Sequence, residues 1–148
     1  MSVREDIALD IISDLQGITD PAVVLVSRNP IVTTDLAITQ YPCIFVRTTS
    51  EAREDGTMNG TRLAEVDYTI IGYIRASSSA TTINNTIDTD RNKLVAAIET
   101  ALEVDRTRNS KALNSYVSSV TVDDGTIYPL GKVDITFTVT YKYTRGTL

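Results

Sequence analysis

The sequence predicts an α+β fold, a mostly antiparallel β-sheet of about five strands packed with two helices in the order α-β-β-β-α-β-β. Two segments repeat apolar residues at helical spacing, and several others alternate apolar and polar residues with the period of a strand. The chain has 148 residues, with no internal repeat and no linker, which suits a single domain spanning 1–148.

The first element is a predicted amphipathic helix in "SVREDIALDIISDLQG". Ser2 and Glu5 have the spacing of a capping box, in which the two side chains bond backbone N–H groups of the first turn. Apolar residues then recur along one stripe: Val3, Ile7, Ile11 and Leu15. Gly17 supplies the stop signal.

Three strands are expected next. The first is the β-branched run "AVVLVS" at 22–27, and the second is "YPCIFVRTT" at 41–49. Pro42 belongs at the start or on an edge of that strand, because proline has no N–H to donate to a ladder. The third strand is the long alternating segment "AEVDYTIIGYIRA" at 64–76.

A second helix is predicted between residues 83 and 104. Its apolar stripe contains Ile87, Leu94, Ile98 and Leu102. Asp88 and Asp90 favour the first turn, where negative charge complements the helix dipole, so the regular part should begin near Asp88.

Two more strands complete the chain, "YVSSVTV" at 116–122 and "GKVDITFTVTYKY" at 131–143. The last segment alternates without a slip and would span roughly 36 Å at about 3.3 Å per residue. One of its faces is apolar and the other is rich in threonine, which keeps strand propensity without exposing apolar surface. We interpret so long a strand as serving an interface as well as a core.

Matching the apolar and polar faces of two strands predicts a register between the closing strand and the strand at 64–76. A right-handed crossover places it antiparallel beside the strand at 64–76, with 116–122 on its other side. Setting Asp67 opposite Lys142 gives complementary charge pairs and puts Gly72 opposite Phe137, whose ring can cover the glycine. Residue numbers across this pair then sum to about 209.

Composition limits the function. The formal net charge of −5 argues against a primary nucleic-acid binder, which needs clustered Lys and Arg. The chain has no histidine and one cysteine, so Ser-His and Cys-His nucleophiles, most zinc sites and an intrachain disulfide are absent. No apolar run approaches the length of about 18 residues that a membrane span needs. We therefore expect neither an enzyme nor a metal or cofactor site.

Individual motifs agree with that expectation. Cys43 stands in an apolar strand and is best interpreted as a small buried hydrophobe. The segment 88–92, "DTDRN", lacks the glycine and the distal glutamate of a calcium loop. Gly56 and Gly60 are not followed by the Gly-Lys-Ser/Thr of a phosphate loop.

Two long connections are predicted, at 29–40 and 50–63, and long loops are often functional. The second contains "EARED", with Arg53, Glu54 and Asp55, which is either a solvated hairpin tip or a docking arm. After the second helix, the segment 103–111 brings charges together: Asp105, Arg106, Arg108 and Lys111. The cations among them, Arg106, Arg108 and Lys111, either complement the helix C-terminus or form an ion-pairing surface toward a neighbouring subunit.

Two stretches resemble a known family. They are "IDTDRNKLVAAIETALEVDRT" and "DDGTIYPLGKVDITFTVTYKYTRG", the latter with its Tyr-Pro-Leu-Gly turn before a strand ending in Tyr-Lys-Tyr. Together with the N-terminal helix they resemble the small tail terminator proteins of long-tailed bacteriophages. The resemblance covers about two-thirds of the chain and is weakest at 29–63.

The resemblance implies a non-enzymatic virion protein, assembled in the host cytoplasm, whose ring of commonly six copies caps the tail tube and presents a joining surface to the neck. Its implied partners are further copies of itself, the tail tube protein, a neck or head-completion protein and, in a contractile tail, the sheath. DNA would only pass through the lumen, and no membrane is involved. On this basis the contact surface is expected at 50–63 and 103–111.

Two alternatives fit the same residues. One is a neck or head-completion ring of the same particle, which would share composition and element order. The other is a small non-catalytic α+β binding domain acting as a monomer or dimer.

Overall fold

The computed structural model describes residues 3–19, 23, 25–28, 41–55, 61–75, 87–108, 110–122 and 130–144. Their elements are α1 (Val3–Gln16), β1 (Leu25–Ser27), β2 (Cys43–Asp55), β3 (Thr61–Arg75), α2 (Ile87–Glu103), β4 (Asn114–Val122) and β5 (Leu130–Thr144). The α+β class and the order α-β-β-β-α-β-β are confirmed. The predicted connection at 29–40 lies outside the described residues.

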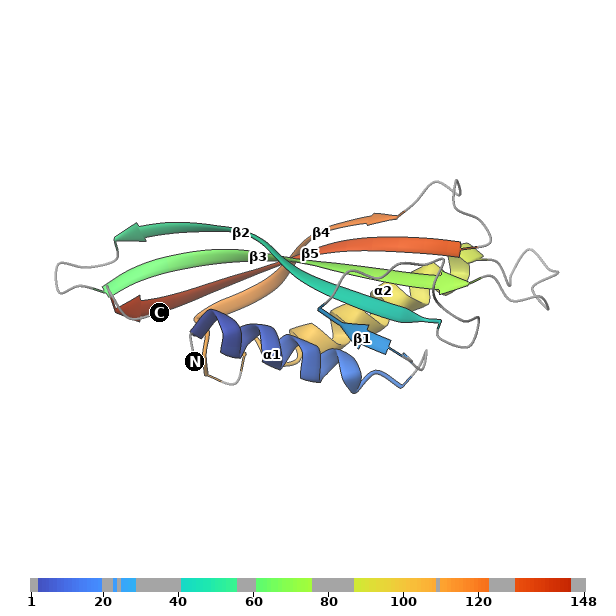
Figure 1. Ribbon diagram of the computed structural model, residues 1–148, viewed down its shortest axis with the longest axis horizontal. Coiled ribbons are helices and arrows are strands. Elements are labelled where there is room, and N and C mark those ends of the chain that lie inside the picture. The colour runs from blue at the N-terminus through green and yellow to red at the C-terminus, as the bar shows by residue number, and fades with distance from the viewer. Residues whose placement is uncertain are drawn as a thin grey trace.

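The strands form one sheet in the order β1-β2-β3-β5-β4. β1 runs parallel to β2, and the other neighbouring pairs are antiparallel. The predicted placement of the closing strand between β3 and β4 is therefore confirmed. Both helices lie on the same side of the sheet (Figure 1).

The core lies between the helices and this face of the sheet. Six residues of the helical stripes are fully buried: Ile7, Ile11 and Leu15 of α1, and Leu94, Ile98 and Leu102 of α2. Beneath them lie alternate residues of β5, including Val133, Ile135, Phe137 and Val139, which are also fully buried. Burying one such side chain stabilises the fold by roughly 1.5–3 kcal/mol, so both sequence periods reflect this single core.

The predicted long loop at 50–63 is wrong. β2 continues to Asp55 and β3 begins at Thr61, so most of that segment is a β-hairpin. Its charged sequence gives no strand signal by itself, and cross-strand pairing supplies what local propensity lacks. The hairpin and the end of β5 extend beyond the N-terminus of α1 (Figure 1). We call this projecting part, residues 50–55, 61–66 and 139–144, the arm.

The predicted register between β3 and β5 is also wrong. Asp67 lies opposite Thr138 instead of Lys142, a displacement of four residues, so the apolar faces are kept but every pair changes. The observed register pairs β3 with β5 from end to end. The predicted one would leave four residues of each strand without a partner. Ladder hydrogen bonds worth about 0.5–1.5 kcal/mol each outweigh exposed charge pairs of about 0.2–1 kcal/mol.

Two β-bulges interrupt β2 and β4 near the middle of the sheet. In β2 the extra residue is Thr49, and in β4 it is Ser118. They fall on either side of the row in which Tyr68 faces Phe137. Bulges bend a strand and increase its twist. Their position coincides with the strongly twisted middle of the sheet (Figure 1).

A row of hydrogen-bonded polar side chains crosses the sheet beside the two bulges, on the face away from the helices. The Thr138 hydroxyl lies 2.9 Å from Asp67 Oδ1 and 3.1 Å from Ser118 Oγ. Ser50 Oγ lies 3.4 Å from the other oxygen of Asp67. Thr138 is only 3% exposed, so part of the threonine-rich face of β5 links strands within the chain.

Candidate interaction surface on the arm

The bulge at Thr49 decides which side chains the arm turns inward. Beyond it, Glu51 lies opposite Val66, and Arg53 lies opposite Ala64. Val66 and Ala64 are core residues, so the bulge moves both charged side chains to the helix-covered face. Uninterrupted alternation from Val46 would have pointed them the other way.

Glu51 is the centre of a charged cluster on this inner face. Its side chain is 8% exposed. Its carboxylate accepts hydrogen bonds from Arg4 Nη1 at 3.2 Å, from Arg53 Nε at 2.6 Å and from the Tyr141 hydroxyl. The contact with Arg4 ties the start of α1 to the arm. Because two cations and a hydroxyl share one nearly buried carboxylate, the orientation of the arm depends on Glu51.

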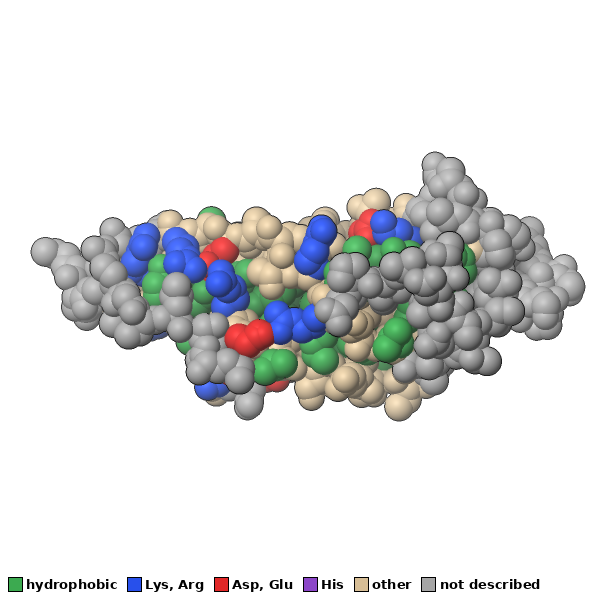
Figure 2. All heavy atoms as spheres, viewed as in Figure 1, with side chains coloured by type: hydrophobic (Ala, Val, Ile, Leu, Met, Phe, Trp, Pro, Cys, Tyr) green, Lys and Arg blue, Asp and Glu red, His purple; other side chains and the backbone are tan. Residues whose placement is uncertain are grey.

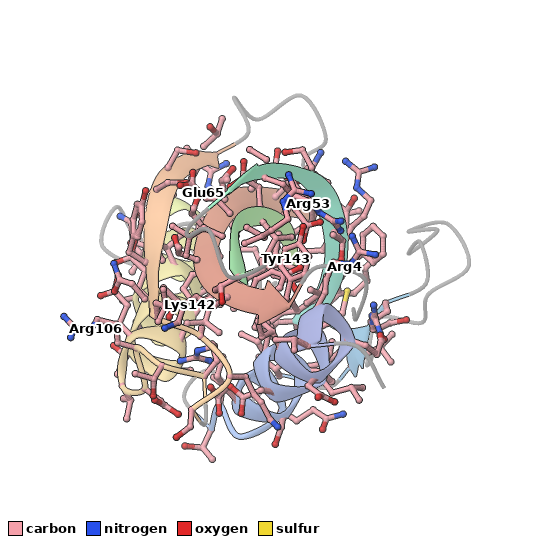
Figure 3. All side chains as sticks on the ribbon, turned by 90° about the vertical axis from the view of Figure 1, so that its left-hand side faces the viewer. Arg4, Arg53, Glu65, Arg106, Lys142 and Tyr143 are labelled. Atoms are coloured by element: carbon pink, nitrogen blue, oxygen red, sulfur yellow. The ribbon has the colours of Figure 1, made fainter. Side chains whose placement is uncertain are left out.

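Tyrosine rings enclose the cluster. The Arg53 guanidinium lies 5.2 Å from the centroid of the Tyr143 ring, and the Tyr141 and Tyr143 rings are 6.0 Å apart. The Tyr68 hydroxyl donates to the backbone oxygen of Arg4 at 3.1 Å. Viewed from the end of the arm, the strands curl around these side chains (Figure 3). Burial, followed by the hydrogen bond to Glu51, raises the pKa of Tyr141.

The outer rim of this cluster is basic. The side chains of Arg4 and Arg53 are 42% and 29% exposed, and their charges are only partly balanced by Glu51. Arg28, 41% exposed, lies near the start of α1 in an ion pair with Glu5. In the view of Figure 2, several Lys and Arg side chains, with Asp and Glu among them, lie over the arm and the middle of the molecule. Arg4, Arg53 and Arg28 therefore place partly exposed cations beside carboxylates, so this surface carries both signs of charge.

Of the three arm residues that the sequence singled out, Arg53, Glu54 and Asp55, one belongs to the charged cluster. Arg53 belongs to the Glu51 cluster. Glu54 and Asp55 lie at the end of β2, opposite Leu63 and Arg62. Sequence reasoning missed Glu51 together with its partners Arg4, Tyr141 and Tyr143. No local signal identifies them, because their meeting depends on the bulge and on the register of β5.

The four charged residues predicted to act together after α2 have different surroundings in the structure. Asp105 stabilises a turn, since its Oδ1 accepts from the backbone N–H of Thr107 at 3.1 Å. Arg106 is exposed, and its side chain points away from the body of the molecule in Figure 3. Lys111 is half-exposed, with Nζ 4.0 Å from a carboxylate oxygen of Asp6. Both Arg106 and Lys111 are accessible to solvent.

Arg108, by contrast, is fully buried, which removes it from the predicted contact surface. Its guanidinium lies 3.2 Å from Asp10 and 2.5 Å from Asp14, both on α1. It also donates to the backbone oxygens of Leu102 and Asp105 at the end of α2. Arg108 therefore links the two helices within the chain. It also complements the C-terminal end of α2, which was the first of the two interpretations of these cations.

Nothing in the described part of the chain forms a group of three or more His, Cys, Asp or Glu that could hold a metal ion. Cys43 is fully buried, as predicted, and burial raises the pKa of its thiol to about 11. Neither helix that the structure describes has the length and apolar character needed to cross a membrane.

The Glu51 cluster makes a stability prediction. Glu51→Gln should lower the free energy of unfolding by about 2–3 kcal/mol, because two arginines and the Tyr141 hydroxyl lose a charged acceptor. Glu65→Gln is the matched control, since Glu65 is exposed and lies on the opposite face of β3. It should change stability by less than about 0.5 kcal/mol in urea unfolding. Equal effects of the two substitutions would show that the cluster contributes nothing.

The sequence and the fold were compared with those of known proteins. No protein-family description matches the sequence, and no curated protein matches it. Among solved structures, this chain is similar to a chain in the virion of a native gene transfer agent particle. The alignment covers 96% of this chain and 92% of the other, with 10% sequence identity and a TM-score of 0.43.

Proposed function

We propose that this chain is the tail terminator of a long-tailed bacteriophage, a non-enzymatic virion protein. In this role a ring of six copies caps the tail tube, ends its polymerisation and offers a joining surface to the neck. The observation that carries the proposal is the sequence resemblance in the segments of the second helix and the closing strands, in the element order expected of that family.

The location of the resembling segments supports the proposal. They fall on α2 and β5, which supply Leu94, Ile98, Leu102 and Phe137 to the core. A resemblance carried by core-building elements concerns the fold itself more than its surface. Function must then be argued from surfaces, because one fold can host many functions.

The arm offers such a surface. It projects from the helix-covered body (Figure 1). Its inner side holds arginines in place through Glu51. Fixing a contact surface before binding reduces the entropy that docking costs. In the proposed role the arm, with Arg53, Glu54 and Asp55, contacts a neighbouring subunit or the last ring of the tube. Arg106 and Lys111 form a second candidate contact.

The test is loss of the protein in a phage that carries its gene. A nonsense mutation should leave DNA-filled heads intact and produce tails of uncontrolled length that do not join heads, as seen by negative-stain electron microscopy. Complementation by the wild-type chain should restore normal tails.

Other outcomes assign other roles. Tails of correct length that remain unattached would indicate the neck or head-completion ring, and normal-length tails attached to heads would eliminate both. A virion that lacks the chain entirely would favour the small non-catalytic binding domain.

A further inference from the structure

The sheet has two open edges that differ from each other. β4 is the last strand on one side, and no described residue pairs with its outer edge. On the other side, β1 pairs only with Cys43–Phe45 of β2. Residues 46–55 of β2 therefore have no strand partner on that side within the described part of the chain. Each edge offers unpaired backbone donors and acceptors over a similar length.

The edge at β4 lacks most of the usual protection against pairing. Its sequence "NSYVSSVTV" contains no charged residue and no proline. Tyr116, Val120 and Val122 are 44%, 41% and 44% exposed. Edge strands that must stay free are normally protected by lysine, proline or bulges, and here only the bulge at Ser118 is present. An uncharged strand with exposed apolar side chains is typical of an edge that another strand covers.

We propose that the outer edge of β4 pairs with residues 46–55 of β2 in a second copy of this chain. The strand directions support this choice. β2 is antiparallel to β3, β3 to β5, and β5 to β4, so β4 is antiparallel to β2. Copies related by rotation about an axis along the strands keep these directions, so the joint between them is an antiparallel ladder.

Pairing between unlike edges also explains how a closed assembly forms. A contact between two different surfaces is head-to-tail, and it generates a ring when its rotation closes. β4 brings no charge to repel Arg47, Glu51 or Arg53 of β2. This inference rests on the proposed ring, and it assigns the joint to the two sheet edges.

Disulfide cross-linking tests the joint. Ser119→Cys on β4 is combined in one chain with Thr49→Cys, Ser50→Cys or Ala52→Cys on β2, all of which are exposed positions. The native Cys43 is buried, with a raised pKa, and should stay unreactive. At least one double variant should give a ladder of covalent oligomers under mild oxidation, ending at the ring size. Each single variant should remain monomeric on a denaturing gel.

A charge on the edge provides an independent test. Thr121→Lys on β4 should lower the fraction of assembled ring by about tenfold in native mass spectrometry at equal concentration. Thr100→Lys is the same change at an exposed position of α2 and should alter assembly by less than about twofold. Thermal unfolding of both variants checks that each is folded.

The outcomes separate this inference from the proposed function. Rings seen by mass, with no ladder from any double variant and no loss with Thr121→Lys, would overturn the edge joint and leave the ring. Dimers from Ser119→Cys alone would show pairing of like edges and overturn it too. Absence of any oligomer, both in purified protein and in virions carrying the variants, would overturn the ring and its joint together.

Discussion

Arg108→Met should lower the free energy of unfolding by about 3–5 kcal/mol, the cost of breaking a buried ion pair by removing one partner. The change leaves Asp10 and Asp14 without their shared cation, and leaves the backbone oxygens of Leu102 and Asp105 without their side-chain donor. It also removes the guanidinium 5.5 Å from the centroid of the Phe137 ring. Urea denaturation followed by circular dichroism measures the loss.

Two controls isolate the buried contact. Arg106→Met removes an arginine two residues away that is exposed, and should cost less than about 0.5 kcal/mol. Arg108→Lys keeps the charge but cannot serve both carboxylates and both carbonyl oxygens, so it should fall between wild type and Arg108→Met. Equal stability of Arg106→Met and Arg108→Met would contradict the assigned role.

The loss should depend on pH. Burial, and then repulsion from Asp14, raises the pKa of Asp10 above its ordinary value of 3.8, while Arg108 opposes that shift. Removing Arg108 raises the folded-state pKa further, so folded Arg108→Met binds a proton more readily than its unfolded chain. Its stability therefore rises as the pH falls toward the ordinary value, and the difference from wild type should shrink. A difference that is constant with pH would argue against unpaired carboxylates.

Gly72→Val should be the second severe change, with a loss of about 3 kcal/mol. A Cβ at this position would lie 2.7 Å from Leu94 Cδ2 and 3.0 Å from Val133 Cγ2. Leu94 and Val133 are both fully buried, so neither can move away without disturbing the packing of α2 on the sheet. Overpacking of this kind costs about 1–3 kcal/mol or more. Thermal and urea unfolding provide the measurement.

Gly72→Ala and a double variant sharpen this test. Glycine in a strand normally destabilises it relative to alanine by roughly 0.5–1 kcal/mol, so an ordinary site would gain stability from Gly72→Ala. Here Gly72→Ala should lose stability. Leu94→Ala leaves a cavity and costs about 2–5 kcal/mol alone, yet combined with Gly72→Val the total should be well below the sum. Strict additivity would show that Leu94 does not occupy the space above Gly72.

A repeating pattern of apolar residues is enough to predict some parts of this fold. The stripes of α1 and α2 and the alternation of β5 identified those elements, because each buries one face in a single core. The end-to-end order of the elements, and the position of β5 between β3 and β4, followed from the same pattern and from the handedness of the crossover.

The alignment of the strands and the meeting of charged side chains depend on tertiary contacts. A four-residue displacement between β3 and β5 keeps every side chain on its face, so alternation cannot detect it. The bulge at Thr49 turns Glu51 and Arg53 inward, although nothing in the local sequence marks an extra residue. Arg108 resembled a surface cation until α1 brought Asp10 and Asp14 beside it. Register, bulges and buried ion pairs depend on contacts between distant segments, whereas periodicity reports only which face of a segment is buried.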